Sequence, residues 1–170
     1  MKRILFLLLF ISMNIHQIFS QVKTENSNDY CSVRGIKFGY IYTVNQIKKT
    51  FGEPYRINCF PANDFGNSYE FYYKDGFTLR MTDDPRELFP GVLCFIITSN
   101  KYVLEYHGIT LTVGDSFDKV KQIPGFTSVE ERGHNFFVIF LNGNNHDESL
   151  RILPDANGKI EVINFEARYY

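Results

Sequence analysis

Apolar and polar residues alternate along several short stretches of the chain, and this period of two predicts antiparallel β-strands. Between Ser68 and Thr82 the alternation fits a hairpin with the three-residue loop Lys74-Asp75-Gly76, in which the glycine takes a left-handed conformation. A two-residue loop would place apolar residues opposite charged ones, so the longer loop is favoured. The predicted register pairs Tyr73 with Phe77, Phe71 with Leu79, Tyr69 with Met81, and Glu70 with Arg80.

A second hairpin is predicted near the end of the chain, where Asn157-Gly158 is typical of a two-residue turn. Residues 92–97 and 136–141 are apolar on both alternating faces, which predicts two central strands. The expected pairs of the hairpin are Leu153–Val162, Ile152–Ile163, Arg151–Asn164 and Leu150–Phe165. Other predicted strands are Pro54–Cys59, Gly91–Thr98, Val129–Arg132 and Phe136–Leu141, and Tyr102–Tyr106 is a candidate edge strand.

Two short helices are predicted by apolar residues that recur at helical spacing. The first begins at Thr43, which forms a capping box with Gln46, and ends at Gly52 before Pro54. Both are too short to be stable alone in water, so each must pack its apolar stripe on a sheet. The second helix is defined by the cap Asp115 or Ser116, the stripe Phe117, Val120 and Ile123, and the terminator Pro124-Gly125.

One unit is used twice in this sequence. Gly35-Ile36-Lys37-Phe38 recurs as Gly108-Ile109-Thr110-Leu111, and the same 73-residue offset relates the two predicted helices. We therefore predict an α+β fold in which two tandem α-β4 repeats form one antiparallel, roughly eight-stranded sheet with two short helices on one face. The repeats span residues 35–107 and 108–170. Positions related by the offset include Thr43 and Ser116, Val44 and Phe117, Ile47 and Val120, Lys48 and Lys121, and Gly52 and Gly125.

The face of this sheet that the helices leave open should carry an apolar band near its middle, contributed by the two predicted central strands. Polar side chains that the hairpin registers place on that face would surround the band. A rimmed apolar band on a protein surface is typical of a binding site. The candidate partner-binding residues are Glu70, Tyr72, Arg80, Arg151 and Asn164.

The first twenty residues are typical of an export signal. Lys2 and Arg3 precede an apolar run from Ile4 to Ile11, and cleavage is expected after Ser20. Residues 21–34 then form a polar N-terminal segment of a single domain over 21–170. An apolar run of eight residues is far shorter than the roughly 20 that a membrane-spanning helix needs, so no transmembrane anchor is expected. The expected location is the periplasm or the extracellular space.

Charge and composition narrow the classes of partner. Without Lys2 and Arg3 the chain carries 16 basic and 19 acidic side chains and no basic cluster, which argues against nucleic acid as a partner. The 17 phenylalanines and 11 tyrosines favour a strand-rich fold. Three cysteines in an oxidising compartment allow one disulfide. All three pairings are open, and we favour Cys31–Cys59, with Cys94 as a buried thiol.

No pattern typical of catalysis, metal binding or cofactor binding accompanies the repeat. His107, His134 and His146 lack metal-ligand spacing, and the first two are expected in turns. Residues 142–148 lack the alternating acidic ligands of a calcium loop, so a polar loop between strands is expected there. The charged stretch 83–87 is likewise expected to be a solvated loop. We therefore expect no cofactor, no metal and no enzymatic activity.

The tandem arrangement resembles the β-lactamase-inhibitor-protein fold and the related outer-membrane-assembly lipoprotein domains. The family's helix signature is Gly-x-Ser/Thr-x-x-x-Val/Ile followed by Gly-x-Pro, although here Ile41 replaces the first glycine and Thr127 the second proline. The resemblance implies non-covalent recognition of partner proteins by the concave sheet face, without implying which partner. The matching positions are Thr43, Ile47, Gly52 and Pro54 in the first copy and Gly114, Ser116, Val120 and Gly125 in the second.

These patterns together predict an exported, non-enzymatic binding module that recognises another protein, in the envelope or outside the cell, through the open face of its sheet. The alternative is a carrier of a small apolar ligand, in which the sheet curls until residues 92–97 and 136–141 line a cavity. A deep enclosed pocket favours the carrier, and a shallow open surface favours protein binding.

Overall fold

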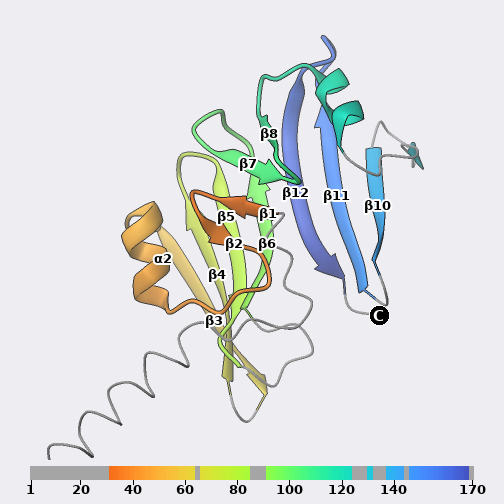
Figure 1. Cartoon of the computed structure of the whole chain (residues 1–170). Helices are drawn as coiled ribbons and strands as arrows, with labels where there is room; N and C mark the ends of the chain where they lie inside the picture. Colours follow the sequence, from red (N-terminus) through yellow and green to blue (C-terminus); the bar gives the residue numbers. More distant parts are fainter. Residues whose placement is uncertain are drawn as a thin grey trace, which may run out of the picture.

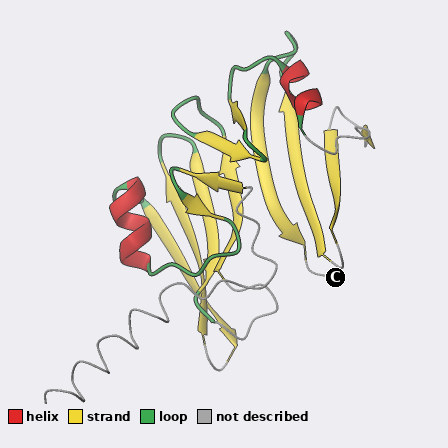
Figure 2. Cartoon of the chain, viewed as in Figure 1, coloured by secondary structure: helices red, strands yellow, loops and turns green. Residues whose placement is uncertain are grey.

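Short antiparallel strands make up most of the described chain (Figure 1), and one α-helix and one 3-10 helix connect them (Figure 2). The computed structural model describes residues 31–63, 66–84, 91–123, 130–131, 137–143 and 146–168. The predicted export signal over residues 1–20 and the segment 21–30 lie outside these ranges. The elements are β1 (Cys31–Val33), β2 (Ile36–Lys37), α2 (Val44–Phe51), β3 (Arg56–Asn63), β4 (Gly66–Tyr73), β5 (Phe77–Thr82), β6 (Gly91–Ile97), β7 (Val103–Tyr106), β8 (Ile109–Thr112), the 3-10 helix η2 (Phe117–Gln122), β9 (Glu130–Glu131), β10 (Phe137–Gly143), β11 (His146–Pro154) and β12 (Ile160–Arg168).

The strands form two sheets rather than the single sheet predicted. The larger sheet has eight strands in the order β3-β4-β5-β6-β12-β11-β10-β9, and a second sheet of four strands has the order β2-β1-β7-β8. The prediction of one sheet was wrong because β1 and β2 are only three and two residues long. Strands of that length show no detectable alternation. In addition, β1 lies within residues 21–34, which the sequence predicted to be a polar N-terminal segment. The broad α+β class with antiparallel strands is confirmed.

The same order of elements occurs twice along the chain. A short hairpin, a helix and four strands follow one another from β1 to β6, and again from β7 to β12. Each hairpin turns through two residues with positive φ, at Arg34-Gly35 (φ 50° and 77°) and at His107-Gly108 (φ 47° and 79°). Two successive left-handed residues are typical of the tight turns that join twisted antiparallel strands. The predicted boundary between residues 107 and 108 therefore falls inside the β7–β8 turn.

The predicted registers of both long hairpins are confirmed. In β4–β5, Glu70 lies opposite Arg80 and Tyr73 opposite Phe77, and Gly76 has φ 86° as the three-residue loop requires. In β11–β12 all four predicted pairs form, but a register shift follows at Leu153 and Pro154, so the turn is longer than two residues. The residues of this hairpin that face the core, all fully buried, are Leu150, Ile152, Ile163 and Phe165.

Helix α2 begins and ends as its sequence predicts. The Thr43 hydroxyl accepts a hydrogen bond from the Gln46 backbone N–H at 3.2 Å, and the Gln46 side chain accepts one from the Thr43 N–H at 2.7 Å. Gly52 has φ 86° and donates its N–H to the Lys48 carbonyl. The capping box satisfies donors that the first turn leaves without helical partners.

The second predicted helix forms as the 3-10 helix η2. Its stripe is oriented as predicted, with Val120 and Ile123 buried, but Ser116 makes no side-chain capping bond. The predicted terminator Pro124-Gly125 lies outside the described residues. Because η2 lacks the capping hydrogen bonds that stabilise the first turn of α2, a short 3-10 helix is favoured over an α-helix there.

The four-stranded sheet and α2 cover one face of the larger sheet. The Phe38 ring, just after β2, meets Phe165 of β12 edge-on at 4.7 Å, and Phe51 of α2 lies 4.6 Å from Phe77 of β5, measured between ring centroids. Burial of these aromatic rings supplies much of the apolar stabilisation of the fold. Buried residues that join the two layers include Val33, Leu104 and Tyr106 of the small sheet, Ile47 of α2, and Leu79, Phe95 and Ile152 of the large sheet.

One of the two predicted central strands is central. Strand β6, which contains residues 92–97, pairs with β5 and β12 in the middle of the large sheet. The prediction for residues 136–141 was wrong, because β10 is the seventh of eight strands and only the two-residue β9 lies beyond it. An apolar run therefore does not by itself determine a strand's position in the sheet.

Candidate binding face of the eight-stranded sheet

All five predicted site residues lie on the same face of the large sheet, the face opposite the core. They alternate along β4, β5, β11 and β12 with residues that are fully buried, such as Phe71, Leu79 and Ile163. This face is called the polar face below. The cross-strand partners are Glu70 with Arg80 and Asn58, Tyr72 with Thr78 and Arg56, and Arg151 with Asn164.

Glu70 and Tyr72 form one polar cluster near the β3 side of the face. The Tyr72 hydroxyl donates to Glu70 Oε2 at 2.6 Å, and Asn58 Nδ2 donates to the same oxygen at 3.1 Å. The Arg56 guanidinium lies over the Tyr72 ring, 4.0 Å from its centroid. The hydrogen bond from Tyr72, followed by that from Asn58 and by the nearby arginines, lowers the pKa of Glu70 against a smaller opposing effect of burial. Glu70 is therefore ionised at neutral pH.

A second cluster is centred on Glu166 of β12. Arg151 Nη2 donates to Glu166 Oε1 at 3.2 Å, and Arg80 Nη2 lies 3.6 Å from Glu166 Oε2. The Glu166 side chain is 16% exposed, while Arg151 and Arg80 are 25% and 41% exposed. One carboxylate thus holds two arginines of the predicted set. Glu166 was missed by the sequence analysis, although its place two residues beyond Asn164 puts it on the same face.

The middle of the polar face carries polar as well as apolar side chains, whereas the sequence predicted an apolar band there. Cys94 of β6 is buried there, and its Sγ lies 3.7 Å from Asn164 Oδ1. Arg80 of the neighbouring strand β5 lies directly opposite Cys94. The β5–β6 register shifts after Arg80 and turns Val92 toward the core, so Val92 does not contribute to the predicted band. The side chains of residues 136–141, which were expected to contribute the rest of the band, lie outside the described part of the chain. Arg80 and Asn164 therefore lie in the middle of the face rather than at a rim.

A surface hollow of about 540 Å³ borders the polar face at the β4–β5 turn. Thr78 of β5 and Ile96 of β6, which face each other in the sheet, form its side toward the polar face, and Tyr55 also lines it. The other lining residues are Tyr73, Lys74, Gly76, Phe77 and Thr98.

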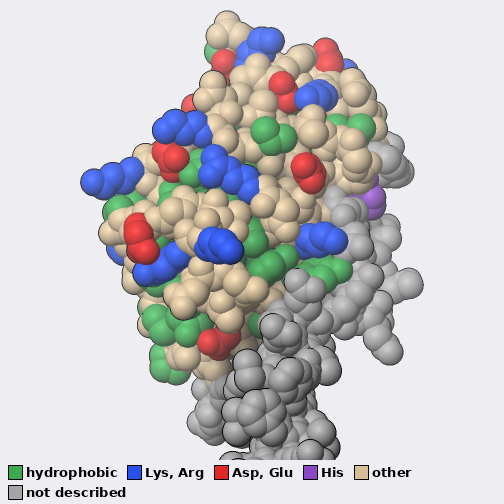
Figure 3. Space-filling model, turned by 60° about the vertical axis from the view of Figure 1, so that its left-hand side comes forward, with side chains coloured by type: hydrophobic (Ala, Val, Ile, Leu, Met, Phe, Trp, Pro, Cys, Tyr) green, Lys and Arg blue, Asp and Glu red, His purple; other side chains and the backbone are tan. Residues whose placement is uncertain are grey.

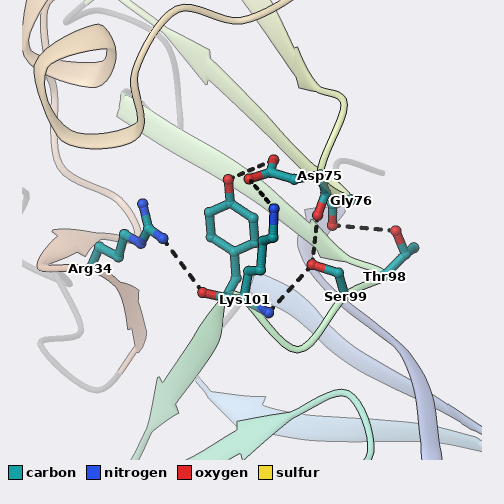
Figure 4. A network of polar contacts seen from close by, with 7 residues as sticks. Arg34, Asp75, Gly76, Thr98, Ser99 and Lys101 are labelled. Carbon is teal, nitrogen blue, oxygen red and sulfur yellow. Dashed lines mark hydrogen bonds and ion pairs between the residues drawn. The ribbon is translucent and has the colours of Figure 1, made fainter.

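Hydrogen bonds hold the turn that forms the edge of this hollow (Figure 4). The Gly76 carbonyl accepts from the Thr98 N–H at 2.8 Å, and the Asp75 carbonyl accepts from Ser99 Oγ at 2.6 Å. The Tyr102 hydroxyl donates to Asp75 Oδ1 at 2.8 Å, and the Lys101 ammonium lies 3.8 Å from the other oxygen. These bonds tie the β4–β5 turn to the segment between β6 and β7, so the hollow is formed before any ligand arrives.

The histidines occupy positions of different kinds. His107 lies in the β7–β8 turn as predicted, its ring edge-on to Tyr106 at 4.8 Å, and burial lowers its pKa. His146 begins β11, so the predicted loop over 142–148 is mostly strand, and His134 lies outside the described residues. In the described part of the chain, no three His, Cys, Asp or Glu side chains are grouped so that they could hold a metal ion.

All three cysteines are free in the structure, so the favoured Cys31–Cys59 disulfide is not formed. Cys31 lies in β1 within the core, whereas Cys59 is exposed on β3 at the edge of the other sheet. Burial raises the pKa of Cys31, and it raises the pKa of Cys94 to about 11. Cys59 is therefore the accessible thiol.

Comparison with known proteins gives no relative: no family model, no curated protein and no solved structure matches the chain. The resemblance to the β-lactamase-inhibitor-protein fold therefore stays a prediction. Within the described residues, no helix has the length and apolar character needed to cross a membrane.

Proposed function

We propose that the protein is an exported, non-enzymatic binding module that recognises another protein through the polar face of its eight-stranded sheet. The observation that supports this most is the grouping of Tyr72, Arg80 and Arg151 with Glu70 and Glu166 on one face. Tyrosine and arginine are enriched among residues that dominate binding energy at protein interfaces. Their hydrogen bonds and ion pairs hold these side chains in place before binding, which lowers the entropic cost of association.

The alternative, a carrier of a small apolar ligand, has less support. It needs residues 92–97 and 136–141 to line one cavity, but β12 and β11 separate β6 from β10 in the sheet. Among the described side chains of these two stretches, only Ile96 lines the hollow at the β4–β5 turn. An open hollow beside a polar sheet face fits the side chain of a protein partner better than an enclosed apolar ligand.

A binding role also fits the state of the Glu70 carboxyl. Its pKa is lowered by the Tyr72 hydroxyl, whereas a general acid that works at neutral pH needs a raised pKa. Glu166 is engaged by two guanidinium groups. Fixed charges of this kind favour a steering and orienting role toward an oppositely patterned surface.

The experiment is affinity capture with the purified protein, produced from the full-length chain, as bait in envelope extract and culture medium of its source. A captured protein is then purified and its Kd is measured by calorimetry. Tyr72→Ala with Arg80→Ala should weaken binding on the order of tenfold or more, because tyrosine and arginine are enriched among the residues whose truncation costs about 2 kcal/mol or more. Lys159→Ala, an exposed change at the β11–β12 turn, is the matched control and should bind normally.

Equal affinity of the double variant and the Lys159→Ala control would show that the polar face is not part of the interface. Thermal unfolding of both variants must accompany the measurement, because Arg80 also pairs with Glu166. A double variant that unfolds like the control but binds more weakly supports the proposal.

A further inference from the structure

The hollow at the β4–β5 turn belongs to the same surface as the predicted site residues. Thr78, which lines the hollow, lies opposite Tyr72 on β4 and opposite Ile96 on β6. Ile96 also lines the hollow and lies opposite Asn164 on β12. Arg80 follows Thr78 by two residues, so its side chain is on the same face of β5. A partner that covers the polar face at Tyr72 and Arg80 therefore also meets the hollow.

Aromatic and aliphatic side chains contribute to the wall of the hollow. The Tyr55 side chain is 55% exposed, and Ile96 is partly exposed on the polar face. The Tyr55 backbone is held in place because its N–H donates to the Tyr72 carbonyl at 3.0 Å. Hydrogen bonds between Gly76 and Thr98, which also line the hollow, hold the turn (Figure 4). A preformed hollow of this kind suits one apolar side chain of a partner.

Two cations beside the hollow have hydrogen-bonding capacity left for a partner. Lys74 lines the hollow, is exposed and forms no ion pair within the part of the chain that the structure describes. Arg80 lies 3.6 Å from Glu166, but Arg151 donates to the same carboxylate at the shorter distance of 3.2 Å. A guanidinium carries five N–H donors, and Glu166 is the only described carboxylate within ion-pair distance of Arg80. Both Lys74 and Arg80 can therefore bind a further anionic group.

The carboxylates near the hollow are already engaged within the chain. Each accepts a hydrogen bond or forms an ion pair with a neighbouring side chain, so the charge left for a partner is that of Lys74 and Arg80. On the side of the molecule that carries α2, by contrast, basic and acidic side chains are interspersed (Figure 3). The engaged carboxylates and their partners are Asp75 with Tyr102 and Lys101, Glu53 with Lys48, and Glu70 with Tyr72 and Asn58.

We propose that the hollow binds an apolar side chain of the partner protein, and that Arg80 and Lys74 bind carboxylates on either side of it in the same extended segment. This inference rests on the proposed function and names the chemistry of the partner, a segment in which acidic residues flank an apolar one. Charge complementarity of this kind favours the matching partner, and it disfavours a partner that presents a basic segment.

The spacing of the two subsites fits an extended chain. Thr78 and Arg80 lie on one face of β5, about 6.8 Å apart along the strand. In an extended partner segment, side chains two positions apart have the same separation and point to the same side. An apolar side chain at Thr78 thus places a carboxylate two positions away at Arg80, and the long side chain of Lys74 reaches a carboxylate on the other side. The expected pattern alternates acidic, apolar and acidic residues with one residue between each.

Synthetic peptides test this pattern. The probe is the end-capped peptide Thr-Glu-Thr-Phe-Thr-Glu-Thr, and in the control peptide lysine replaces both glutamates. Each is titrated at low ionic strength into isotope-labelled protein produced from the full-length chain, and the backbone amide signals are followed by NMR. The acidic peptide should bind with a Kd on the order of 1 mM and shift the amide signals of Thr78, Ile96 and Thr98. The basic peptide should bind about tenfold more weakly or worse.

Charge reversal separates this contact from general electrostatic attraction. Lys74→Glu should weaken binding of the acidic peptide on the order of tenfold and strengthen binding of the basic peptide. Lys49→Glu is the matched control, because it makes the same change at an exposed site on α2, which packs on the opposite face of the large sheet. This control should bind both peptides nearly as the unmodified protein does.

Equal binding of the two peptides, or no shift at Thr78 and Ile96 in low millimolar acidic peptide, would overturn the inference. An equal effect of Lys74→Glu and Lys49→Glu would also overturn it. The proposed function has a separate test, since it fails if the variant with Tyr72→Ala and Arg80→Ala binds its partner as tightly as its control. Weaker partner binding by that variant without peptide binding at the hollow would retain the polar face as the interface and reject this partner chemistry.

Discussion

Arg80 and Glu166 come from the two halves of the chain and face each other across the middle of the large sheet, with Nη2 3.6 Å from Oε2. Between their strands lies β6, which pairs with β12 in antiparallel register at four positions. Arg151 of β11, which donates a hydrogen bond to Glu166, completes the group. The contact therefore connects the halves on the polar face, while Phe165 and Phe95, paired in the same two strands, are buried in the core.

Replacing Glu166 should destabilise the protein by a moderate amount. Glu166→Gln keeps the shape of the side chain but removes the carboxylate that Arg151 and Arg80 share, and we expect the free energy of unfolding to fall by roughly 1–2 kcal/mol. Partial exposure of both arginines limits the loss. Urea unfolding checks this. A double-mutant cycle with Arg151→Met should give a coupling energy, and zero coupling would show that the pair contributes nothing.

The Tyr72–Glu70 hydrogen bond should make stability depend on acidic pH. Because the folded-state pKa of Glu70 is lowered, its contribution is present above the unfolded-state pKa and is lost as pH falls through the folded-state value. Tyr72→Phe removes the donor, so the carboxyl pKa should rise and the loss of stability between pH 7 and pH 3 should be smaller. NMR titration of the Glu70 carboxyl measures the first effect and urea unfolding the second. An unchanged titration curve would contradict the contact.

A methyl group at Gly91 should be poorly tolerated. Gly91 has φ 92°, and a Cβ there would overlap the carbonyl oxygen of Tyr40, which accepts the Val92 N–H. We expect Gly91→Ala to lower the free energy of unfolding by roughly 3 kcal/mol or more, through strain and overlap together. Gly114→Ala is the control, since Gly114 has φ 93° but open space around it, and should cost about 1 kcal/mol. Similar losses in the two variants would refute the close approach.

The two helix starts should respond differently to alanine. Thr43→Ala removes a hydroxyl that accepts the Gln46 N–H, and we expect a loss of about 1 kcal/mol. Ser116 makes no side-chain capping bond, so Ser116→Ala should change stability by only a few tenths of a kcal/mol. Thermal unfolding of both variants side by side gives the difference. A larger loss at Ser116 would mean that η2 is capped in solution in a way that the structure does not have.

The features that could be predicted from the sequence are those that depend on neighbouring residues. The β4–β5 register follows from the polarity match between Glu70 and Arg80, and the start of α2 follows from the spacing of Thr43 and Gln46. Each signal lies within about fifteen residues and has one low-energy solution. The side of the sheet on which Tyr72 and Arg151 lie follows from the same registers.

Features that depend on distant strands could not be predicted. The second sheet forms because β1 pairs with β7 across 73 residues, as in Ser32 opposite Glu105, and no local pattern encodes that contact. The register shift after Arg80 turns Val92 inward, which a simple alternation cannot anticipate. Glu166 could have been added to the site by extending the alternation of Asn164 by two residues.

Export is tested by the N-terminus of the protein recovered from periplasm or medium, which should begin near Gln21 if the predicted signal is removed.

The most direct test of the proposed binding face is hydroxyl-radical footprinting of the protein alone and in complex with its captured partner. Oxidation of Tyr72 on the polar face should fall strongly in the complex, while that of Val103 on β7 of the small sheet, 39% exposed, should stay unchanged. Protection of Val103 with no change at Tyr72 would show that the partner binds the small sheet and would contradict the proposed function.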